Sequence, residues 1–388
     1  MKIPGALPAP GLPGGGWSLL AQALADPASM ARHTAPQWDL LLRQAAAAGL
    51  AGRLGALAAE SGILEQFPAP ARRTLRSWLT MAEQQRRAVH WELLHLARDL
   101  QALPGPVLLL KGAAYAAAGL PNAAGRLCSD IDLMVARDQL DAAEAALLLG
   151  GWAPARMSPY DLRYYRRWMH ELPPMTHIRR QTVLDVHHHI LPPTARLKPR
   201  PEPILNDAQA LPSQPRFAVP APVDLVLHSA THRFHEGDWG HGLRDLVDLD
   251  VLLRHFSSVQ PDFWAALLAR AAQQGLGRPL HYGLHHAHRV LGTPVPREVR
   301  AACPDRPGRW LGALMHASFD AGLRSIHRSV RAPGSDAALA FLYLRSHALR
   351  MPPSLLLPHL ARKAWQGAIG ERIAEARERR AAAVRDRH

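Results

Sequence analysis

The hydrophobic pattern of the chain changes at residues 103–106, where the sequence reads LPGP. Over residues 71–103, apolar side chains recur at three- and four-residue intervals, which predicts an amphipathic helix. Beyond the break, a wholly apolar run at 107–110 and an alternating stretch at 130–135 have the pattern of strands. The change of period therefore excludes an all-helical fold and predicts that a sheet begins just after residue 106.

Predicted strands and helices follow one another between residues 104 and 192. Helical segments are expected at 113–120 and 139–149, the second ended by Gly150-Gly151. The predicted strands lie at 107–110, 130–135, 175–179 and 182–190. We therefore expect an α+β protein whose small mixed-sheet core is flanked by helical regions on both sides in the sequence.

The rest of the chain divides by composition. Pro and Gly interrupt residues 1–16, which predicts a flexible arm. Residues 17–103 are expected to form an N-terminal helical region, and 223–388 a C-terminal one. Between the core and the latter, residues 193–222 are rich in Pro and are predicted to run over the surface as an extended connection.

The basic excess says little about the partner. Lys and Arg number 46 against 32 Asp and Glu, for a formal charge of +14. Only four of the basic residues are lysines, so biased base composition explains the excess as well as a polyanionic partner does. Residues 321–388 carry 13 Lys and Arg against 5 Asp and Glu, so a nucleic acid would bind there if anywhere.

Cysteine use and hydropathy point to the cytoplasm. Cys128 and Cys303 are far apart in the sequence and give neither a CxxC pair nor a disulfide framework. No uncharged apolar run approaches the roughly 20 residues that span a bilayer. We therefore expect a cytoplasmic protein without a membrane partner.

Lys111-Gly112 directly follows the first predicted strand. A glycine at a strand-to-helix junction lets backbone N–H groups approach an anion, and Lys111 adds a mobile positive charge. The alternative is that Gly112 serves only the sterics of the turn. The pair alone does not decide between these interpretations.

Asp130 and Asp132 lie two residues apart in the segment RLCSDIDLMV. In a strand both side chains point to one face, while Ile131 and Leu133 point into a core. Two carboxylates so close repel one another, and a divalent cation such as Mg²⁺ relieves the repulsion. A solvated strand edge that carries two charges is the competing interpretation.

Asp185 lies in the predicted strand LDVHHHI and shares its face with His187 and His189. It is a candidate third carboxylate for a site that holds two Mg²⁺ ions. The three consecutive histidines also suggest a transition-metal site, but a strand distributes them over two faces.

Together these segments resemble the nucleotidyltransferase superfamily of the DNA polymerase β type. Specifically, the chain is similar to the bacterial nucleotidyltransferase family proteins, whose pattern runs roughly K-G, R-x-x-S-D-I-D and D-x-H. The likeness covers about residues 105–255. It departs from the superfamily at Ala113, where a serine more typically follows the glycine.

The resemblance implies a metal-dependent enzyme that moves a nucleoside monophosphate from an NTP, with ATP as the expected donor, to an acceptor hydroxyl. It implies that Asp130, Asp132 and Asp185 are catalytic and bind Mg²⁺. Nucleotide-binding roles are implied for the residues that surround the triphosphate: Lys111, Gly112, Arg126 and Ser129. The acceptor stays open between a small molecule, a protein and tRNA.

The pattern extends to a later helical stretch. His228 and His232 are four residues apart on a predicted helix, so they share one face, either at the mouth of the cleft with His187 or packed as structural histidines. Arg244, Asp245 and Asp248 are expected to form an ion-pair cluster within the helix. Other functions remain open: a catalytically degenerate nucleotide- or partner-binding protein, and an RNA-modifying toxin.

Overall fold

A computed structural model describes residues 17–235, 237–324, 327–357 and 365. The predicted arm at 1–16 lies outside the described residues. So does the part of the basic stretch 321–388 that follows residue 357, apart from residue 365. The described part is a mixed α+β fold with one mixed sheet and helices around it, which confirms the predicted fold class.

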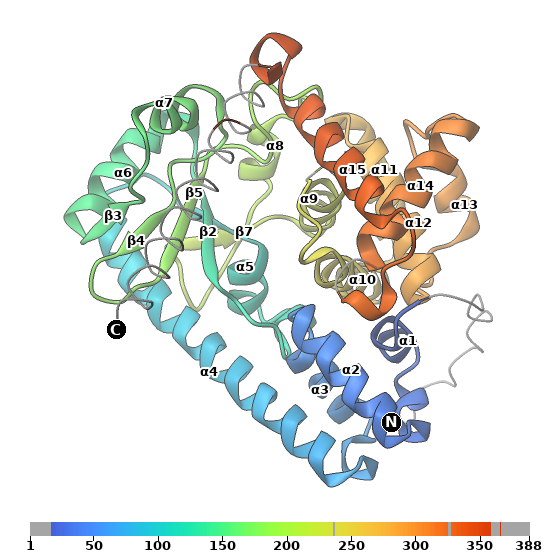
Figure 1. Cartoon of the computed structure of the whole chain (residues 1–388). Helices are drawn as coiled ribbons and strands as arrows, with labels where there is room; N and C mark the ends of the chain where they lie inside the picture. The colour runs from blue at the N-terminus through green and yellow to red at the C-terminus, as the bar shows by residue number, and fades with distance from the viewer. Residues whose placement is uncertain (1–16, 236, 325–326, 358–364, 366–388) are drawn as a thin grey trace, which may run out of the picture.

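Helices α1 to α4 precede the sheet. Their bounds are Leu19–Ala25, Ala35–Ala47, Ala51–Glu60 and Ala69–Asp99. The helix α4 carries the predicted apolar stripe, with Leu75, Val89 and Leu96 buried, and it ends just before the LPGP break. Figure 1 shows α4 extending from the strands toward α2 and α3.

The sheet has seven strands in the order β3-β4-β5-β2-β1-β7-β6. The strand β2 pairs antiparallel with β1 and parallel with β5, and β1 also pairs parallel with β7. The strand bounds are β1 Val107–Leu110, β2 Asp130–Met134, β3 Trp152–Pro154, β4 Met175–His177, β5 Val183–His187, β6 Gln209–Ala210 and β7 Phe217–Val219. The intervening helices are α5 Lys111–Ala117, α6 Leu140–Leu149, α7 Pro159–Trp168 and α8 Pro201–Asn206.

The Pro-rich segment 193–222 differs from its prediction, because it contains α8, β6 and β7 instead of a plain extended connection. All three residues of β7 are buried, and the strand lies beside β1 near the centre of the sheet. The prolines flank these elements: Pro201 stands in the first turn of α8, where no N–H is needed, and Pro220 follows β7. They therefore limit the length of each element without preventing it.

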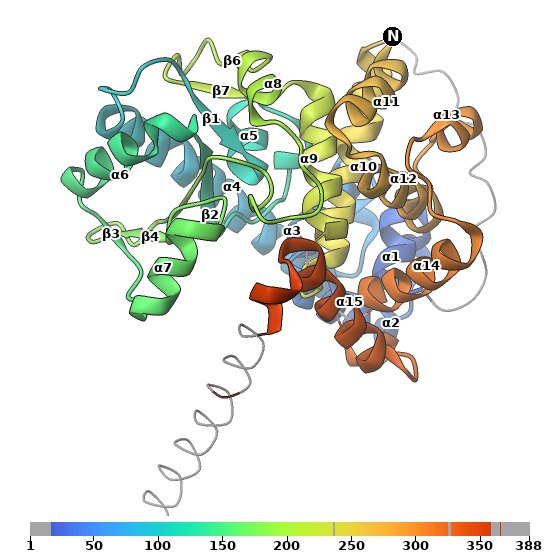
Figure 2. The same ribbon diagram turned by 90° about the horizontal axis from the view of Figure 1, so that it is seen from above.

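Helices α9 to α15 cover the sheet on one side. Their bounds are α9 Pro222–His235, α10 Gly242–Val259, α11 Phe263–Gln274, α12 Gly277–Leu291, α13 Arg297–Ala302, α14 Arg309–Arg324 and α15 Ser335–Arg350. Figures 1 and 2 show α9 and α10 between the strands and the outer helices α11 to α14. The helix α9 is buried almost all round, as expected of a helix enclosed on all sides. Among the described helices, none combines the length and the hydropathy needed to cross a bilayer.

Candidate active site

A cavity of about 190 Å³ lies between the strand ends of β1 and β2 and the helices α9 and α10. Eight of the ten residues that the sequence singled out line it: Lys111, Gly112, Arg126, Ser129, Asp130, Asp132, His228 and His232. The other two, Asp185 and His187, lie on β5, the parallel neighbour of β2. The fold thus gathers residues from four separate segments at one edge of the sheet.

The three carboxylates share one face of the sheet. The parallel register of β2 and β5 places Asp132 directly opposite Asp185, and Asp130 lies two residues earlier on β2. Asp132 is buried, and Asp130 and Asp185 are half-buried. The Oδ1 atom of Asp185 is enclosed and has no hydrogen-bond partner within the described part of the chain. Burial, followed by repulsion from Asp132, raises the pKa of Asp185 to about 6.

Asp132 is held by two nitrogen groups. Its Oδ1 lies 2.7 Å from Lys111 Nζ and 3.1 Å from His187 Nε2. Burial alone would raise the pKa of Asp132, but the Lys111 ammonium and the imidazole outweigh it and hold that pKa well below its usual range. Glu171 Oε2 lies 3.1 Å from the other ring nitrogen of His187 and so fixes the orientation of the ring.

The turn from β1 into α5 is built differently from the prediction. Lys111, not Gly112, takes the left-handed backbone conformation, with φ at +45°. A β-carbon added at Gly112 would lie 2.3 Å from Arg126 Nη1 and 2.8 Å from Cys128 Sγ. The glycine is therefore needed for space, because the Arg126 guanidinium packs directly against it.

Arg126 lines the cavity, and its positive charge is already paired with a carboxylate. Its Nε lies 3.0 Å from Asp248 Oδ2 on α10, and its Nη1 lies 3.4 Å from Cys128 Sγ. Asp248 thus joins α10 to the loop before β2. Of the ion-pair cluster expected within the helix, the structure has the pair of Arg244 Nη2 and Asp245 Oδ1, which lie 3.4 Å apart. Asp245 forms a second link, because its Oδ2 lies 3.0 Å from Arg233 Nη1 on α9.

The histidines of α9 face the cavity opposite the carboxylates. His228 is buried, and burial, with Lys111 as the next cause, lowers its pKa to about 3. Burial lowers the pKa of His232 well below its usual value too. Both imidazoles are therefore neutral at pH 7, and each has one N–H to donate and one nitrogen to accept.

Some residues in and beside the cavity had no signal in the sequence. Glu171 meets His187 through an isolated bridge, which leaves no periodic pattern. Together with His170 these residues bring three ligand atoms within 4.8 Å of one another, a group able to hold a metal ion. The cavity is also lined by Tyr115, Ser229 and His241, which had no such signal, and by Arg244, which belongs to the predicted helical cluster.

The run of three histidines does not form a metal site in the described structure. Only His187 reaches the carboxylates. The strand β5 ends at that residue, three positions earlier than predicted, and His189 Nε2 lies 2.7 Å from the carbonyl oxygen of Pro199. The chain turns away before its proline pair at 192–193, and the side chain of His189 serves the turn, because its Nδ1 also accepts from Leu191 N–H.

Comparison with known proteins gives one family. Residues 34–292, two thirds of the chain, match the model of a family described as an uncharacterised nucleotidyltransferase. No curated protein matches the chain.

Proposed function

The chain belongs to this nucleotidyltransferase family, and from that premise we propose that it transfers a nucleoside monophosphate from an NTP to an acceptor hydroxyl in a Mg²⁺-dependent reaction. The observation that carries the proposal is the pairing of Asp132 with Asp185 across two parallel strands, with Asp130 on the same face. Two carboxylates that line the cavity and a third beside them repel one another, and a divalent cation would relieve that repulsion.

The carboxylates fit Mg²⁺. They offer hard oxygen donors, and the enclosed Oδ1 of Asp185 has no other partner among the described residues. Asp130, Asp132 and Asp185 would hold the metal, with a second ion as the expected complement. When bound, Mg²⁺ would neutralise phosphate charge and lower the pKa of a hydroxyl beside it.

The donor nucleotide enters with its phosphates toward Lys111. A cavity of about 190 Å³ suits the triphosphate end, because whole ligands usually take about 300 Å³ or more. Lys111 Nζ offers positive charge there, and the neutral rings of His228 and His232 donate hydrogen bonds to phosphate or sugar oxygens. Ser129 is exposed at the rim, where its hydroxyl can reach the same oxygens. ATP is the proposed donor.

The acceptor hydroxyl attacks the α-phosphorus in line with the leaving group. Its oxygen forms the new bond to phosphorus, the bond from the α-phosphorus to the bridging oxygen breaks, and pyrophosphate departs. The carboxylate of Asp185, whose pKa is raised to about 6, would accept the hydroxyl proton through the oxygen that does not hold the metal. Asp132 stays ionised between Lys111 and His187. Positioning and charge neutralisation then account for most of the rate.

The test is transfer of label from each α-³²P-labelled NTP, with Mg²⁺, to the RNA, protein and metabolite fractions of a cell extract. We expect one fraction to be labelled and pyrophosphate to be released. Asp132→Asn and Asp185→Asn should each lower the rate by about 100-fold or more. Asp138→Asn is the matched control, because Asp138 is an exposed carboxylate four residues after β2 ends.

Equal transfer by the wild type and both cavity variants would overturn the proposal. NTP binding in calorimetry, with no pyrophosphate released with any fraction, would indicate a protein that binds nucleotide without chemistry. Label on RNA, with growth arrest on expression that Asp132→Ala relieves, would identify an RNA-modifying toxin.

A further inference from the structure

A second group of histidines lies away from the candidate active site, on α12 and α14. His285 and His286 are consecutive on α12, and His316 comes from α14. One ligand atom from each lies within 4.8 Å of those of the other two. His286 is fully buried, and the other two are partly buried, so the group is enclosed between the two helices.

The nitrogen spacing suits one bound ion. His316 Nδ1 lies 3.2 Å from His286 Nε2. Two nitrogens bound to one tetrahedral Zn²⁺ at about 2.1 Å lie about 3.4 Å apart. A hydrogen bond between the two rings would also give this distance, but it would leave the third histidine without a partner.

That third histidine is His285, and its Nε2 is enclosed without a hydrogen-bond partner in the described structure. Its ring stacks on that of His316, with the centroids 3.7 Å apart. An enclosed imidazole nitrogen is costly to leave unsatisfied. A metal ion at the edges of the rings, within reach of one nitrogen from each histidine, would satisfy it.

Asp320 stands behind the buried histidine. Its Oδ1 lies 3.3 Å from His286 Nδ1, and its Oδ2 lies 2.5 Å from Arg289 Nη1. At 3.3 Å, Asp320 Oδ1 and His286 Nδ1 are within ion-pair reach but do not form a hydrogen bond in the described structure. A carboxylate that closes on the far nitrogen of a histidine favours the tautomer that leaves Nε2 free to bind a metal. Asp320 is therefore suited to be a positioning residue for His286.

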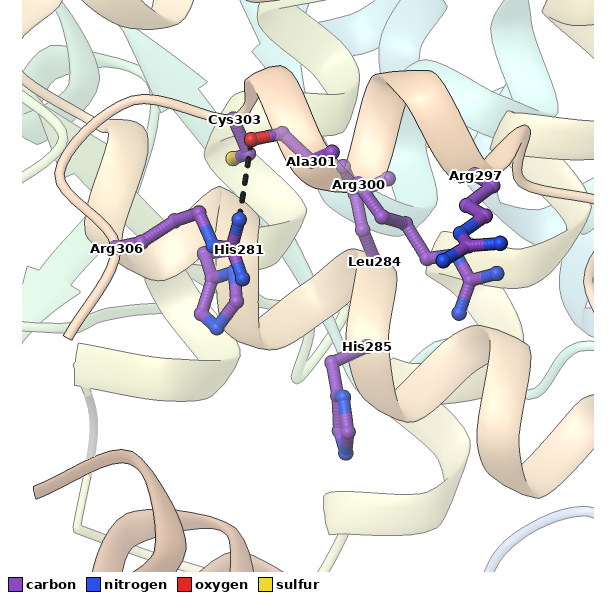
Figure 3. Close-up of a pocket in the computed structure, with 8 residues that line it drawn as sticks. All are labelled: His281, Leu284, His285, Arg297, Arg300, Ala301, Cys303 and Arg306. Atoms are coloured by element: carbon purple, nitrogen blue, oxygen red, sulfur yellow. Dashed lines mark hydrogen bonds between the residues drawn. The ribbon is translucent and has the colours of Figure 1, made fainter. Parts of the chain in front are cut away.

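The group is connected to solvent through a pocket of about 380 Å³. Figure 3 shows that His281 and His285 line this pocket together with Arg297 and Arg300. Since His285 belongs both to the pocket wall and to the histidine group, the pocket gives room for water or a small anion to complete the coordination.

We propose that His285, His286 and His316 bind a transition-metal ion, with Zn²⁺ as the expected ion. Neutral imidazoles favour zinc, copper and nickel over magnesium. The ion would link α14 to α12. The site also adjoins α9, because the ring of Phe234 stacks on that of His286 with the ring centroids 5.5 Å apart. The proposal does not depend on nucleotidyl transfer, because none of the three histidines lines the catalytic cavity.

The test uses the full chain without a histidine tag, treated with chelator and then dialysed into excess Mg²⁺. Calorimetry should detect one tightly bound Zn²⁺ per chain at this site, and Co²⁺ in its place should give the visible absorption of a tetrahedral site. His285→Gln and His316→Gln should lose both signals. Asp320→Asn should weaken Zn²⁺ binding by about 10- to 100-fold.

Two controls separate this site from others. His281→Gln changes a histidine of the same helix and pocket that is outside the group, and it should keep the Zn²⁺ affinity. His187→Gln removes the possible metal group beside the active site and should also leave this ion in place. Absence of Zn²⁺ binding by the wild type, or unchanged binding by folded His285→Gln and His316→Gln, would overturn the assignment. If the His281→Gln variant loses Zn²⁺ binding while His285→Gln and His316→Gln keep it, the assignment is overturned as well.

Discussion

Lys111 Nζ lies 2.7 Å from Asp132 Oδ1, and the lysine reaches it from a left-handed backbone conformation. A non-glycine residue in that region costs roughly 1 kcal/mol or more. The strand-to-helix turn therefore holds its lysine against a backbone preference, at the point where the proposed triphosphate binds.

Two substitutions separate the charge of Lys111 from its backbone strain. Lys111→Met and Lys111→Gly both remove the ammonium, so both should slow label transfer by at least about tenfold. Glycine also relieves the positive φ, so Lys111→Gly should be more stable than Lys111→Met by about 1 kcal/mol in urea unfolding. Full label transfer by Lys111→Met would show that the charge is not needed. A Lys111→Gly variant that is less stable than Lys111→Met would contradict the argument from backbone strain.

Gly112→Ala should displace Arg126, because the new methyl group would lie 2.3 Å from its Nη1. We expect a loss of about 1–3 kcal/mol in unfolding free energy and weaker binding of NTP in calorimetry. Gly308→Ala is the matched control, since a β-carbon there has no neighbour within 4 Å and the backbone φ is ordinary. An alanine at 112 that leaves both stability and NTP affinity at the level of this control would contradict the packing argument.

The pair formed by Arg126 and Asp248 should be strongly coupled in a double-mutant cycle. Both side chains are largely buried, so Arg126→Met or Asp248→Asn alone leaves a charge without its partner and should cost about 3–5 kcal/mol. The double variant should lose much less than the sum of the two single changes, measured by urea unfolding. Additive losses would mean that the two groups do not interact.

His235 should make the protein sensitive to acid. Burial, with Arg350 and Arg345 as further causes, lowers its pKa to about 3 from the model-peptide value of 6.5. Between these two pH values the unfolded chain binds a proton that the folded chain does not, so stability falls as the pH falls. The loss is about 1.4 kcal/mol per pH unit in that window.

His235→Leu removes this titration. Its unfolding free energy, measured in urea at pH 7, 6, 5 and 4, should fall less steeply below pH 6 than that of the wild type. Parallel curves for the two proteins would show that His235 does not contribute to the acid sensitivity.

Local patterns predicted much of the fold and of the site. The apolar period located α4, and the alternation around Asp130 and Asp132 located β2, because both signals come from one element packing against a core. The K-G and R-x-x-S-D-I-D segments predicted the nucleotidyltransferase family, which the family match confirms. Their roles in binding and catalysis stay predictions.

Tertiary pairing explains what the sequence could not predict. The strand β7 is three residues long and lies among prolines, so its place beside β1 depends on a partner 110 positions earlier. Arg126 and Asp248 meet across 122 positions, and no local pattern links them. Glu171 reaches His187 through a single bridge for the same reason.

The pairing of β7 with β1 also bears on how the chain folds during synthesis. Until residue 219 has left the ribosome, β1 can pair only with β2, and its other edge, with the sequence VLLL, stays open. An open apolar edge is a template for aggregation. A fragment cut at residue 192 keeps every proposed catalytic carboxylate but exposes this edge permanently. The late strand β7 therefore covers an edge of β1 that stays exposed until residue 219 is available to pair with it.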